Sequence, residues 1–378
     1  MRQPPHRVDG VGRLVHTIHK YFIWLVIGSY VVASVMPSLG LWIRDVKLGS
    51  VSFLGGTLRI SLPLLMLASL LFNAGLGVKP AELRHLLRKP MMVMLGLLGK
   101  VFVPVIFIFC LAAIGRIWYE PVEVQQVLVG LALVAAMPIA GSSTAWAQNA
   151  NGNLTLSLSL VLFSTILSPI VTPLVLHAIE YATIGDYAKA LQHVASGGIG
   201  TFLGVWVILP SFLGIAARYL MGEYRTASVR PVLKLINYVV LLLLNYSNAS
   251  LSLPKTIAQP DFDLLIAIFV ISTSLCAIAF ACGFGLSQMF GADLPSRASL
   301  MFGLGMSNNG TGLVLASMML GDHPQVMLPI IFYNLIQHMV AALVDHFMLR
   351  RAADSEDNAP SQADGPNPQI GGAATNFD

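Results

Sequence analysis

Long apolar blocks separated by short polar stretches run along almost the whole chain. Ten blocks reach roughly 18 residues or more, the length that a helix needs to cross about 30 Å of hydrocarbon. They cover residues 21–43, 58–78, 91–114, 124–147, 153–179, 191–221, 229–253, 262–288, 298–320 and 326–349. This pattern predicts an all-α membrane protein with ten transmembrane helices in a single domain at residues 21–350.

Two of these blocks are interrupted by residues that break helices. The fourth contains MPIAGSSTAWAQNANGN (137–153) and the ninth contains GLGMSNNGTG (303–312). Each is the fourth block of a set of five, and a second five-span unit must lie inverted relative to the first. Matched interruptions of this kind indicate inverted repeats, here residues 21–179 and 191–350, with a site near the membrane midplane. We expect helices 4 and 9 to be broken and to cross, the ninth meeting the fourth at residues 141–144.

Broken helices survive in hydrocarbon only where they are buried in protein or line a watery cavity. A half-helix that begins near Ser143 or Ser307 presents free N–H groups, which suit an anion, while the preceding half-helix offers carbonyls, which suit a cation. The alternative is that these small residues only allow close helix packing. Further residues at the interruptions, for which a cavity role and a structural hydrogen bond both stay open, are Gln148, Asn149, Asn308 and Asn309.

Composition agrees with a membrane location. Hydrophobic residues make up 56% of the chain, charged residues 11%, and the mean hydropathy is +0.74. If the N-terminus is cytoplasmic, most Lys and Arg residues lie in cytoplasmic segments, which favours both termini inside a plasma or inner membrane. Residues 1–20 carry an apolar stripe that fits an interfacial helix, and residues 351–378 are expected to form a disordered cytoplasmic tail.

Lys100 lies near the middle of the third block. Charged groups at this depth usually face the bundle interior and serve function, although a lysine can also extend its stem to the membrane surface. Because burial disfavours the charged form of an amine, Lys100 could be a fixed internal cation or could exchange protons during transport. Four residues one helical turn apart in the last block, for which cavity and packing roles stay open, are Tyr333, Asn334, Gln337 and His338.

Other functions lack their motifs. The sequence contains no HExxH, GxSxG or GxxxxGK[ST] pattern, so we expect neither an enzyme nor an ATP-driven pump. No basic face with interleaved aromatic residues predicts nucleic-acid binding. The three cysteines lie in apolar blocks, where packing is their usual role, and we expect no cofactor.

The interrupted stretches resemble the bile acid:sodium symporter family. The similarity is carried by residues 138–157 and 303–310, and by PIIFYNLIQH (329–338), LSPIVTP (167–173) and AGLGV (74–78). It extends over nearly the whole chain from about Tyr21 to Arg350. The resemblance implies ten helices, an inverted five-plus-five repeat, a panel domain and a core domain.

The family's first sodium site is only partly present. The resemblance places its two serines on Ser143 and Ser157, which are kept. Its asparagine falls on Thr144, and a threonine one turn later falls on Val161. The resemblance therefore implies a weakened first sodium site.

The second sodium site has changed its charge. The glutamate shared by both sites falls on Gly303, one glutamine falls on Ser307, and a third-span glutamine falls on Lys100. Only the backbone carbonyls of Leu304 and Met306 carry over. Since the carboxylate is lost and an amine is gained, Lys100 could fill the second sodium position and donate to Ser307 and to those two carbonyls.

These observations predict a secondary transporter that moves a small organic solute by alternating access. They favour an organic anion as that solute. Its partners would be that solute and membrane lipid, and the oligomeric state stays open. The alternatives are a sodium-coupled organic anion symporter with altered ligands, a carrier of the arsenite or auxin type, and a transport-inactive membrane sensor or scaffold.

Overall fold

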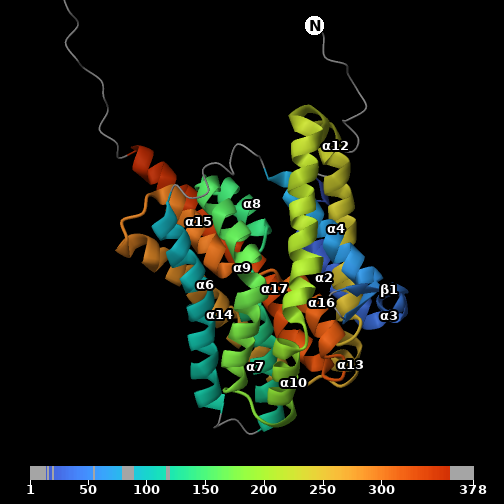
Figure 1. The fold of residues 1–378 in the computed structure, drawn as a ribbon. Coiled ribbons are helices and arrows are strands. Elements are labelled where there is room, and N and C mark those ends of the chain that lie inside the picture. The colour runs from blue at the N-terminus through green and yellow to red at the C-terminus, as the bar shows by residue number, and fades with distance from the viewer. Residues whose placement is uncertain are drawn as a thin grey trace, which may run out of the picture.

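The computed structural model describes residues 14, 17, 18, 21–53, 56–78, 89–115 and 120–357. In this part of the chain the structure is a bundle of long helices with one small hairpin (Figure 1). The interfacial helix expected in residues 1–20 falls largely outside the described residues, as does the tail after residue 357.

The N-terminal part departs from two expected spans. The block expected at 21–43 is divided into α2 (Phe22–Val35) and α3 (Ser38–Asp45), which are bent by 94° around Pro37. The start of the second block forms an antiparallel hairpin of β1 (Lys47–Phe53) and β2 (Gly56–Ser61) before α4 (Leu62–Gly77) begins. Alternating polar residues such as Ser50 and Ser52 suit a strand better than a membrane helix.

The remaining chain is almost wholly helical. Its elements in order are α6 (Pro90–Gly115), α7 (Pro121–Ala136), α8 (Ser142–Asn149), α9 (Leu154–Glu180), α10 (Gly185–Ser196), α11 (Ile199–Leu203), the π-helical η1 (Gly204–Ile208), α12 (Leu209–Ala249), α13 (Leu253–Ala258), α14 (Phe262–Met289), α15 (Leu294–Gly305), α16 (Asn309–Met319), η2 (Pro324–Val326) and α17 (Met327–Asp357). The last helix continues past the boundary expected at Arg351, so residues 351–357 are helical rather than part of the predicted tail.

Five helical stretches in the described residues are long and apolar enough to cross a membrane, and the bent pair α2–α3 makes a sixth. One of the five joins two expected spans, because α12 continues through the polar segment between them with a kink at Gly222. The φ of 74° and ψ of 172° at this residue are open to glycine but strained for other residues.

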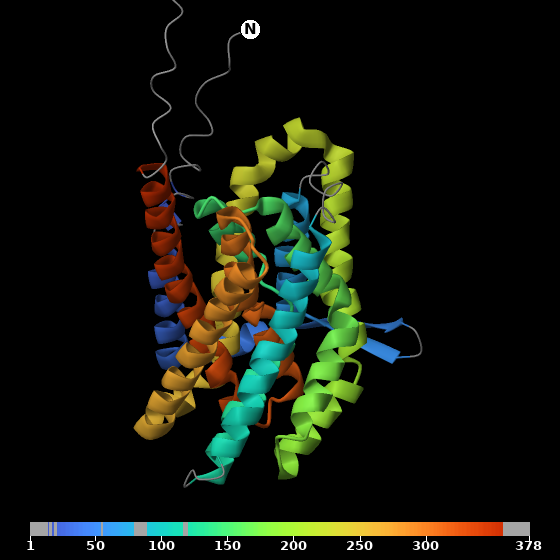
Figure 2. The same ribbon diagram turned by 90° about the vertical axis from the view of Figure 1, so that its left-hand side faces the viewer.

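Two groups of helices pack around different partners. Helix α12 packs on α4, α2 and α3, and we call these four helices the panel group. Helices α6 to α9 and α14 to α17 pack mainly on one another, and we call them the core group. Figure 2 shows α17, in red, beside α2, in blue, so the two groups meet there.

Small residues allow the close approach of α4 and α12 in the panel group. A Cβ atom on Gly214 would lie 2.0 Å from the Phe72 carbonyl oxygen, and one on Gly75 would lie 2.0 Å from the Ser211 carbonyl oxygen. The two backbones therefore touch, as at the small-residue interfaces of membrane helices. At the end of this interface Arg218 Nη1 donates to the Leu76 carbonyl (3.0 Å) and caps α4.

Replacing Gly214 with alanine should destabilise the panel group, because the added methyl meets backbone atoms that cannot move aside. Overpacking of this kind costs about 1–3 kcal/mol. Gly285→Ala in α14 is the matched control, since a Cβ there meets no atom within 4 Å. Thermal unfolding in detergent should show a lower midpoint for Gly214→Ala alone; equal midpoints for the two variants would contradict the close contact.

Candidate substrate and ion site

Two interrupted helices cross in the core group, as the sequence predicts. The first break covers residues 137–141 between α7 and α8, and the second covers residues 306–308 between α15 and α16. Ala140 N donates to the Met306 carbonyl (3.1 Å) and Asn308 N donates to the Pro138 carbonyl (2.9 Å). Ile139 and Ser307 thus pair as an antiparallel β-bridge, and each break satisfies backbone groups of the other.

The crossing lies earlier in the chain than expected. It uses residues 138–140, whereas we expected residues 141–144, which form the start of α8. Pro138 accounts for the difference, because proline lacks an N–H and disfavours a helical conformation in the residue before it. Helix α7 therefore stops at Ala136.

The two half-helices begin differently. Asn308 caps α16, since its side chain accepts from the Thr311 N–H (3.3 Å). The N-cap of α8 is Gly141, which has no side chain for this purpose. Asn308 therefore has a structural hydrogen bond, whereas the start of α8 uses backbone acceptors: the Ser143 and Thr144 N–H groups donate to the Ala140 and Gly141 carbonyls (3.0 and 3.3 Å).

Lys100 reaches the crossing from α6. Its side chain is only 5% exposed, and its ammonium donates to the Ser307 hydroxyl. The predicted contact with Ser307 is therefore present. The Met306 carbonyl, which we also expected to accept from Lys100, accepts the Ala140 N–H. The ammonium also lies at the C-terminal end of α15, where a positive charge is favoured.

The glutamate position of the resembling family is filled by a neighbouring side chain. A Cβ on Gly303 would lie 2.9 Å from Leu160 Cδ1. Leu160 is itself fully buried, in α9. A side chain at residue 303 would thus require the end of Leu160, a residue that sequence reasoning did not single out, to shift.

Residues that the resemblance assigns to the first sodium site lie together. Ser157 Oγ donates to Thr144 Oγ1 (3.1 Å), which joins α9 to α8. Ser143 is fully buried, and its hydroxyl has no partner among the described residues. Val161 supplies only its backbone carbonyl, which accepts from Ser164 and Thr165.

Buried polar atoms without partners also occur at the start of α16. Both amide atoms of Asn309 and the hydroxyl of Thr311 lack a partner in the described structure, and both side chains are at most 1% exposed. Thr311 was not selected from sequence, although it lies inside the interrupted stretch. Since buried polar groups are normally hydrogen-bonded, these atoms and Ser143 mark a polar region of the crossing whose hydrogen-bonding capacity the described residues do not use.

Two expected site residues do not lie at the crossing itself. Gln148 and Asn149 are exposed at the C-terminal end of α8, one helix length from the crossing. Their part in a substrate cavity stays a prediction. Leu304 is buried near the end of α15 and packs with Leu160.

Helix α17 supports the crossing through residues whose role the sequence left open. Gln337 Oε1 accepts from the Ser307 N–H (3.0 Å), and the Tyr333 hydroxyl donates to the Gly305 carbonyl (3.0 Å). Trp146 Nε1 lies 3.4 Å from His338 Nδ1. These contacts give α17 a direct part in holding both interrupted stretches.

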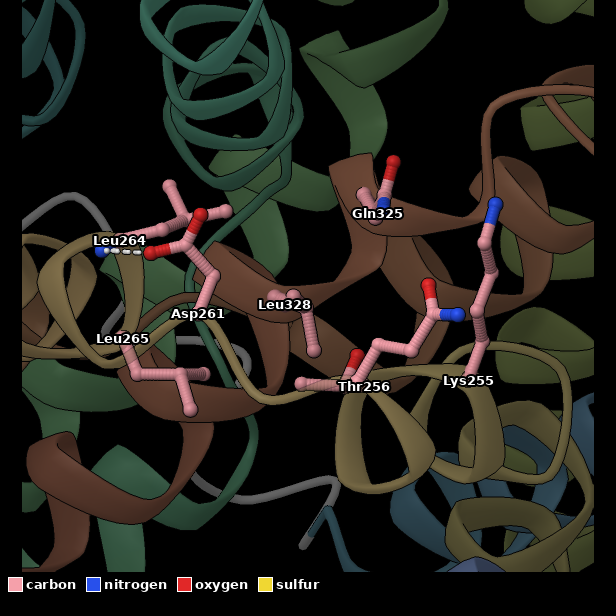
Figure 3. A pocket seen from close by; sticks show the side chains of 8 residues that line it. Lys255, Thr256, Asp261, Leu264, Leu265, Gln325 and Leu328 are labelled. Atoms are coloured by element: carbon pink, nitrogen blue, oxygen red, sulfur yellow. Dashed lines mark hydrogen bonds between the residues drawn. The ribbon is translucent and has the colours of Figure 1, made fainter.

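A cavity of about 50 Å³ lies apart from these residues, between α13, the start of α14 and the start of α17 (Figure 3). At its edge Asp261 accepts the Leu264 N–H (3.0 Å) and caps α14. This hydrogen bond lowers the pKa of Asp261. The volume suits a few water molecules rather than an organic solute, so we do not place the site there.

A polar contact joins the starts of α6 and α15. Lys89 Nζ binds Asp293 Oδ1 (3.1 Å) and donates to Ser296 Oγ (2.8 Å). Asp293 caps α15 by accepting from the Ser296 N–H (3.3 Å). The hydrogen bond from the Ser296 side chain, and then the contact with Lys89, lower the pKa of Asp293.

A helical membrane bundle in which two broken helices cross at buried polar groups is the arrangement of secondary transporters. A model of the sodium bile acid symporter family matches residues 64–260. The chain belongs to this family. It is accordingly an integral membrane protein and a secondary transporter, as the sequence analysis predicted.

Individual relatives agree with this assignment. The uncharacterized protein YbaS of Bacillus subtilis is 29% identical over 286 residues, 75% of this chain and 87% of that protein. YocS of the same organism, named as an uncharacterized sodium-dependent transporter, is 25% identical over 313 residues, 82% of this chain and 85% of that protein. A probable chloroplastic sodium/metabolite cotransporter of rice, BASS1, is 27% identical over 198 residues, 51% and 44% of the two chains.

Removing the carboxylate at residue 293 should loosen the start of α15. Asp293→Ala is expected to cost about 1 kcal/mol through loss of the cap, measured by unfolding in detergent. Asp186→Ala, which breaks an exposed pair with Lys189 but no cap, should change stability by less than about 0.5 kcal/mol. Equal losses in the two variants would argue against the capping role.

The same residue predicts a pH effect. Because folding lowers the pKa of Asp293 below its ordinary 3.8, its contribution is present above that value and is lost as pH falls through the lowered pKa. Asp293→Asn keeps an acceptor for the cap but cannot titrate. The unfolding midpoint of Asp293→Asn should therefore fall less than that of the native protein below pH 3.8; parallel curves would contradict this account.

Proposed function

We propose that this protein carries a small organic anion by alternating access and that the ammonium of Lys100 stands where the family binds its second sodium ion. The observation that carries the proposal is the buried hydrogen bond between Lys100 and Ser307 at the crossing. It places a positive group of the protein beside the broken helices.

The local charge supports an anionic solute. The start of α8 is the positive end of that helix and has no side-chain cap. Ser143, Asn309 and Thr311 add buried hydrogen-bonding atoms without partners among the described residues. Their donors can bind carboxylate or sulfonate oxygens, and Lys100 supplies positive charge to the same region.

The ion chemistry follows from two positions. Gly303 brings no carboxylate, and Leu160 fills the space beside it. Sodium would therefore have to share this region with an ammonium, and none of the residues that the resemblance assigns to the second site carries a negative side chain. Lys100 serves either as a fixed cation or as a group that releases and regains a proton in each cycle.

The proposal includes ten spans arranged as two inverted five-span units. Six of the stretches described above are already candidate spans. Three further spans are α4, the α7–α8 pair and the α15–α16 pair, and the tenth arises when α12 is counted as two spans that meet at Gly222. Antiparallel pairing at the crossing is the geometry that an inverted repeat produces. Both termini are then cytoplasmic, as the distribution of Lys and Arg suggests.

A sodium-coupled symporter is the second candidate. The relative YocS is named as sodium-dependent, and this chain keeps Ser143 and Ser157 of the first site. A sensor or scaffold that has lost transport is the third reading, which uptake measurements separate from the other two.

Uptake by purified protein in liposomes tests the proposal. The probes are labelled taurocholate and a panel of small labelled carboxylates, each measured in sodium and in choline buffer. We expect saturable uptake of at least one probe at equal rates in both buffers. Lys100→Gln should lower that uptake about tenfold, the effect of about 1.4 kcal/mol, whereas exposed Lys189→Gln should not.

Other results would change the proposal. A strict sodium requirement would establish the sodium-coupled symporter, and no uptake of any probe would favour the sensor or scaffold. Faster uptake under an inward proton gradient, lost in Lys100→Gln, would identify Lys100 as a proton carrier rather than a fixed cation.

A sodium site should return when its lost parts are restored. The variant combines Lys100→Gln, Gly303→Glu and Ser307→Gln with Leu160→Ala, which clears the space next to residue 303. Sodium, but not potassium, should raise its unfolding midpoint. The same variant with Leu160 retained should respond less, and a lack of response in both would count against the placement of the second site.

Membrane topology is testable with single cysteines. In a background without Cys110, Cys276 and Cys282, cysteines are placed at exposed Arg225 and Lys255. Arg225 should react with an impermeant maleimide only from the cytoplasmic side and Lys255 only from the opposite side. Labelling of both from one side would contradict the ten-span arrangement.

A further inference from the structure

A continuous set of hydrogen bonds leads from Lys100 to the panel group. We call it the relay, and its members are Lys100, Ser307, Gln337, Asn334 and Tyr30. Beyond the Lys100–Ser307 bond, Ser307 N donates to Gln337 Oε1 (3.0 Å), Gln337 Nε2 to Asn334 Oδ1 (3.3 Å), and Asn334 Nδ2 to the Tyr30 hydroxyl (3.1 Å).

The relay is shielded from solvent for most of its length. Tyr30 is 6% exposed and Gln337 only 2%. Removing one partner at such a site leaves a buried polar atom unsatisfied, which is costly. The bonds are therefore expected to form and break together.

The direction of the bonds is fixed from one end. The Ser307 N–H can only donate, so the amide of Gln337 must turn its oxygen toward it. The Gln337 nitrogen then has to donate to Asn334, whose own nitrogen is left to donate to Tyr30. A backbone group at the crossing thus sets the orientation of two side-chain amides on α17.

The last bond crosses between the two helix groups. Asn334 belongs to α17 in the core group, and Tyr30 belongs to α2 in the panel group. Alternating access requires these groups to move relative to each other, so a bond between them distinguishes one arrangement from another. The bond at the other end of the relay, between Lys100 and Ser307, exists only while the Lys100 ammonium stays beside Ser307.

We propose that Gln337 and Asn334 are positioning residues that couple the Lys100–Ser307 contact to the contact between α17 and α2. This inference rests on the proposed function for its role in transport, but the coupling itself is a property of the folded protein. When Lys100 leaves Ser307, the turn at residue 307 loses a partner, the Gln337 amide shifts, and the bond to Tyr30 weakens.

A double-mutant cycle measures this coupling without any transport. Tyr30→Phe removes the acceptor of Asn334 and keeps the ring. Tyr246→Phe is the matched control, because Tyr246 is equally buried and its hydroxyl donates to the Met36 carbonyl inside the panel group. Each change is combined with Lys100→Met, and unfolding midpoints are measured in detergent.

We expect Tyr30→Phe to lower the midpoint by about 2–4 °C in the native protein. In the Lys100→Met background its effect should fall to less than half, while the effect of Tyr246→Phe stays the same in both backgrounds. Ser307→Ala replaces Lys100→Met if the latter does not fold, since it removes the acceptor of Lys100 but keeps the backbone donor. Additive effects of Tyr30→Phe would overturn the relay.

Transport measurements provide a second test that is independent of the unfolding cycle. With any probe that the native protein takes up, Tyr30→Phe should lower the maximal rate about threefold or more and leave KM unchanged, because Tyr30 acts on the movement of the helix groups. Tyr246→Phe should change neither. Coupling in the unfolding cycle without any uptake would leave the relay in place and refute only the proposed function; a changed KM with additive unfolding effects would refute the relay.

Discussion

Every backbone polar group within a membrane needs a partner, and two stretches of this chain meet that need by pairing with each other. An unpaired group in hydrocarbon costs several kcal/mol, so neither broken helix is stable alone at this depth. The short antiparallel bridge between Ile139 and Ser307 joins the first and second halves of the chain at one point. Helix α17, Lys100 and the α8–α9 contact are all arranged around that point, and the proposed site depends on it.

Family and ion chemistry are separate questions in this protein. The family match and the crossing describe an architecture that serves secondary transport. The ligands for a cation are set by individual side chains, and here a glycine, a serine and a lysine stand at the three positions that the resemblance assigns to the second site. The relative YocS is named as sodium-dependent, but that name says nothing of the side chains that stand at these three positions in the present chain.

The long uninterrupted helices and the location of both breaks could be predicted from sequence, because apolar length and helix-breaking residues act locally. The contact of Lys100 with Ser307 followed from the resemblance. The hairpin at residues 47–61 and the bend at Pro37 were missed, since a run of apolar residues does not distinguish a strand from a helix start. The distance of Gln148 and Asn149 from the crossing could not be predicted, because nearness in sequence to a break says little about which end of a half-helix reaches it.

Other features depend on contacts between distant segments and leave no local signal. From the sequence, Thr311 is an ordinary polar residue; only the structure shows that its hydroxyl is buried without a hydrogen-bond partner among the described residues. Leu160 reads as one of many leucines in an apolar block until its distance from Gly303 is known. The orientation of the Gln337 and Asn334 amides likewise requires the position of a backbone N–H thirty residues away from Gln337.

The packing of Leu160 against Gly303 also ties together positions that lie far apart in the chain. A glutamate introduced at residue 303 alone would push the end of the Leu160 side chain aside, and its charge would be offset by the buried ammonium of Lys100 rather than left for a free cation. A smaller side chain at residue 160 alone would leave a void. The size of residue 160, the charge of residue 100 and the identity of residue 303 are therefore coupled, and a substitution at one of them changes what the other two can accept.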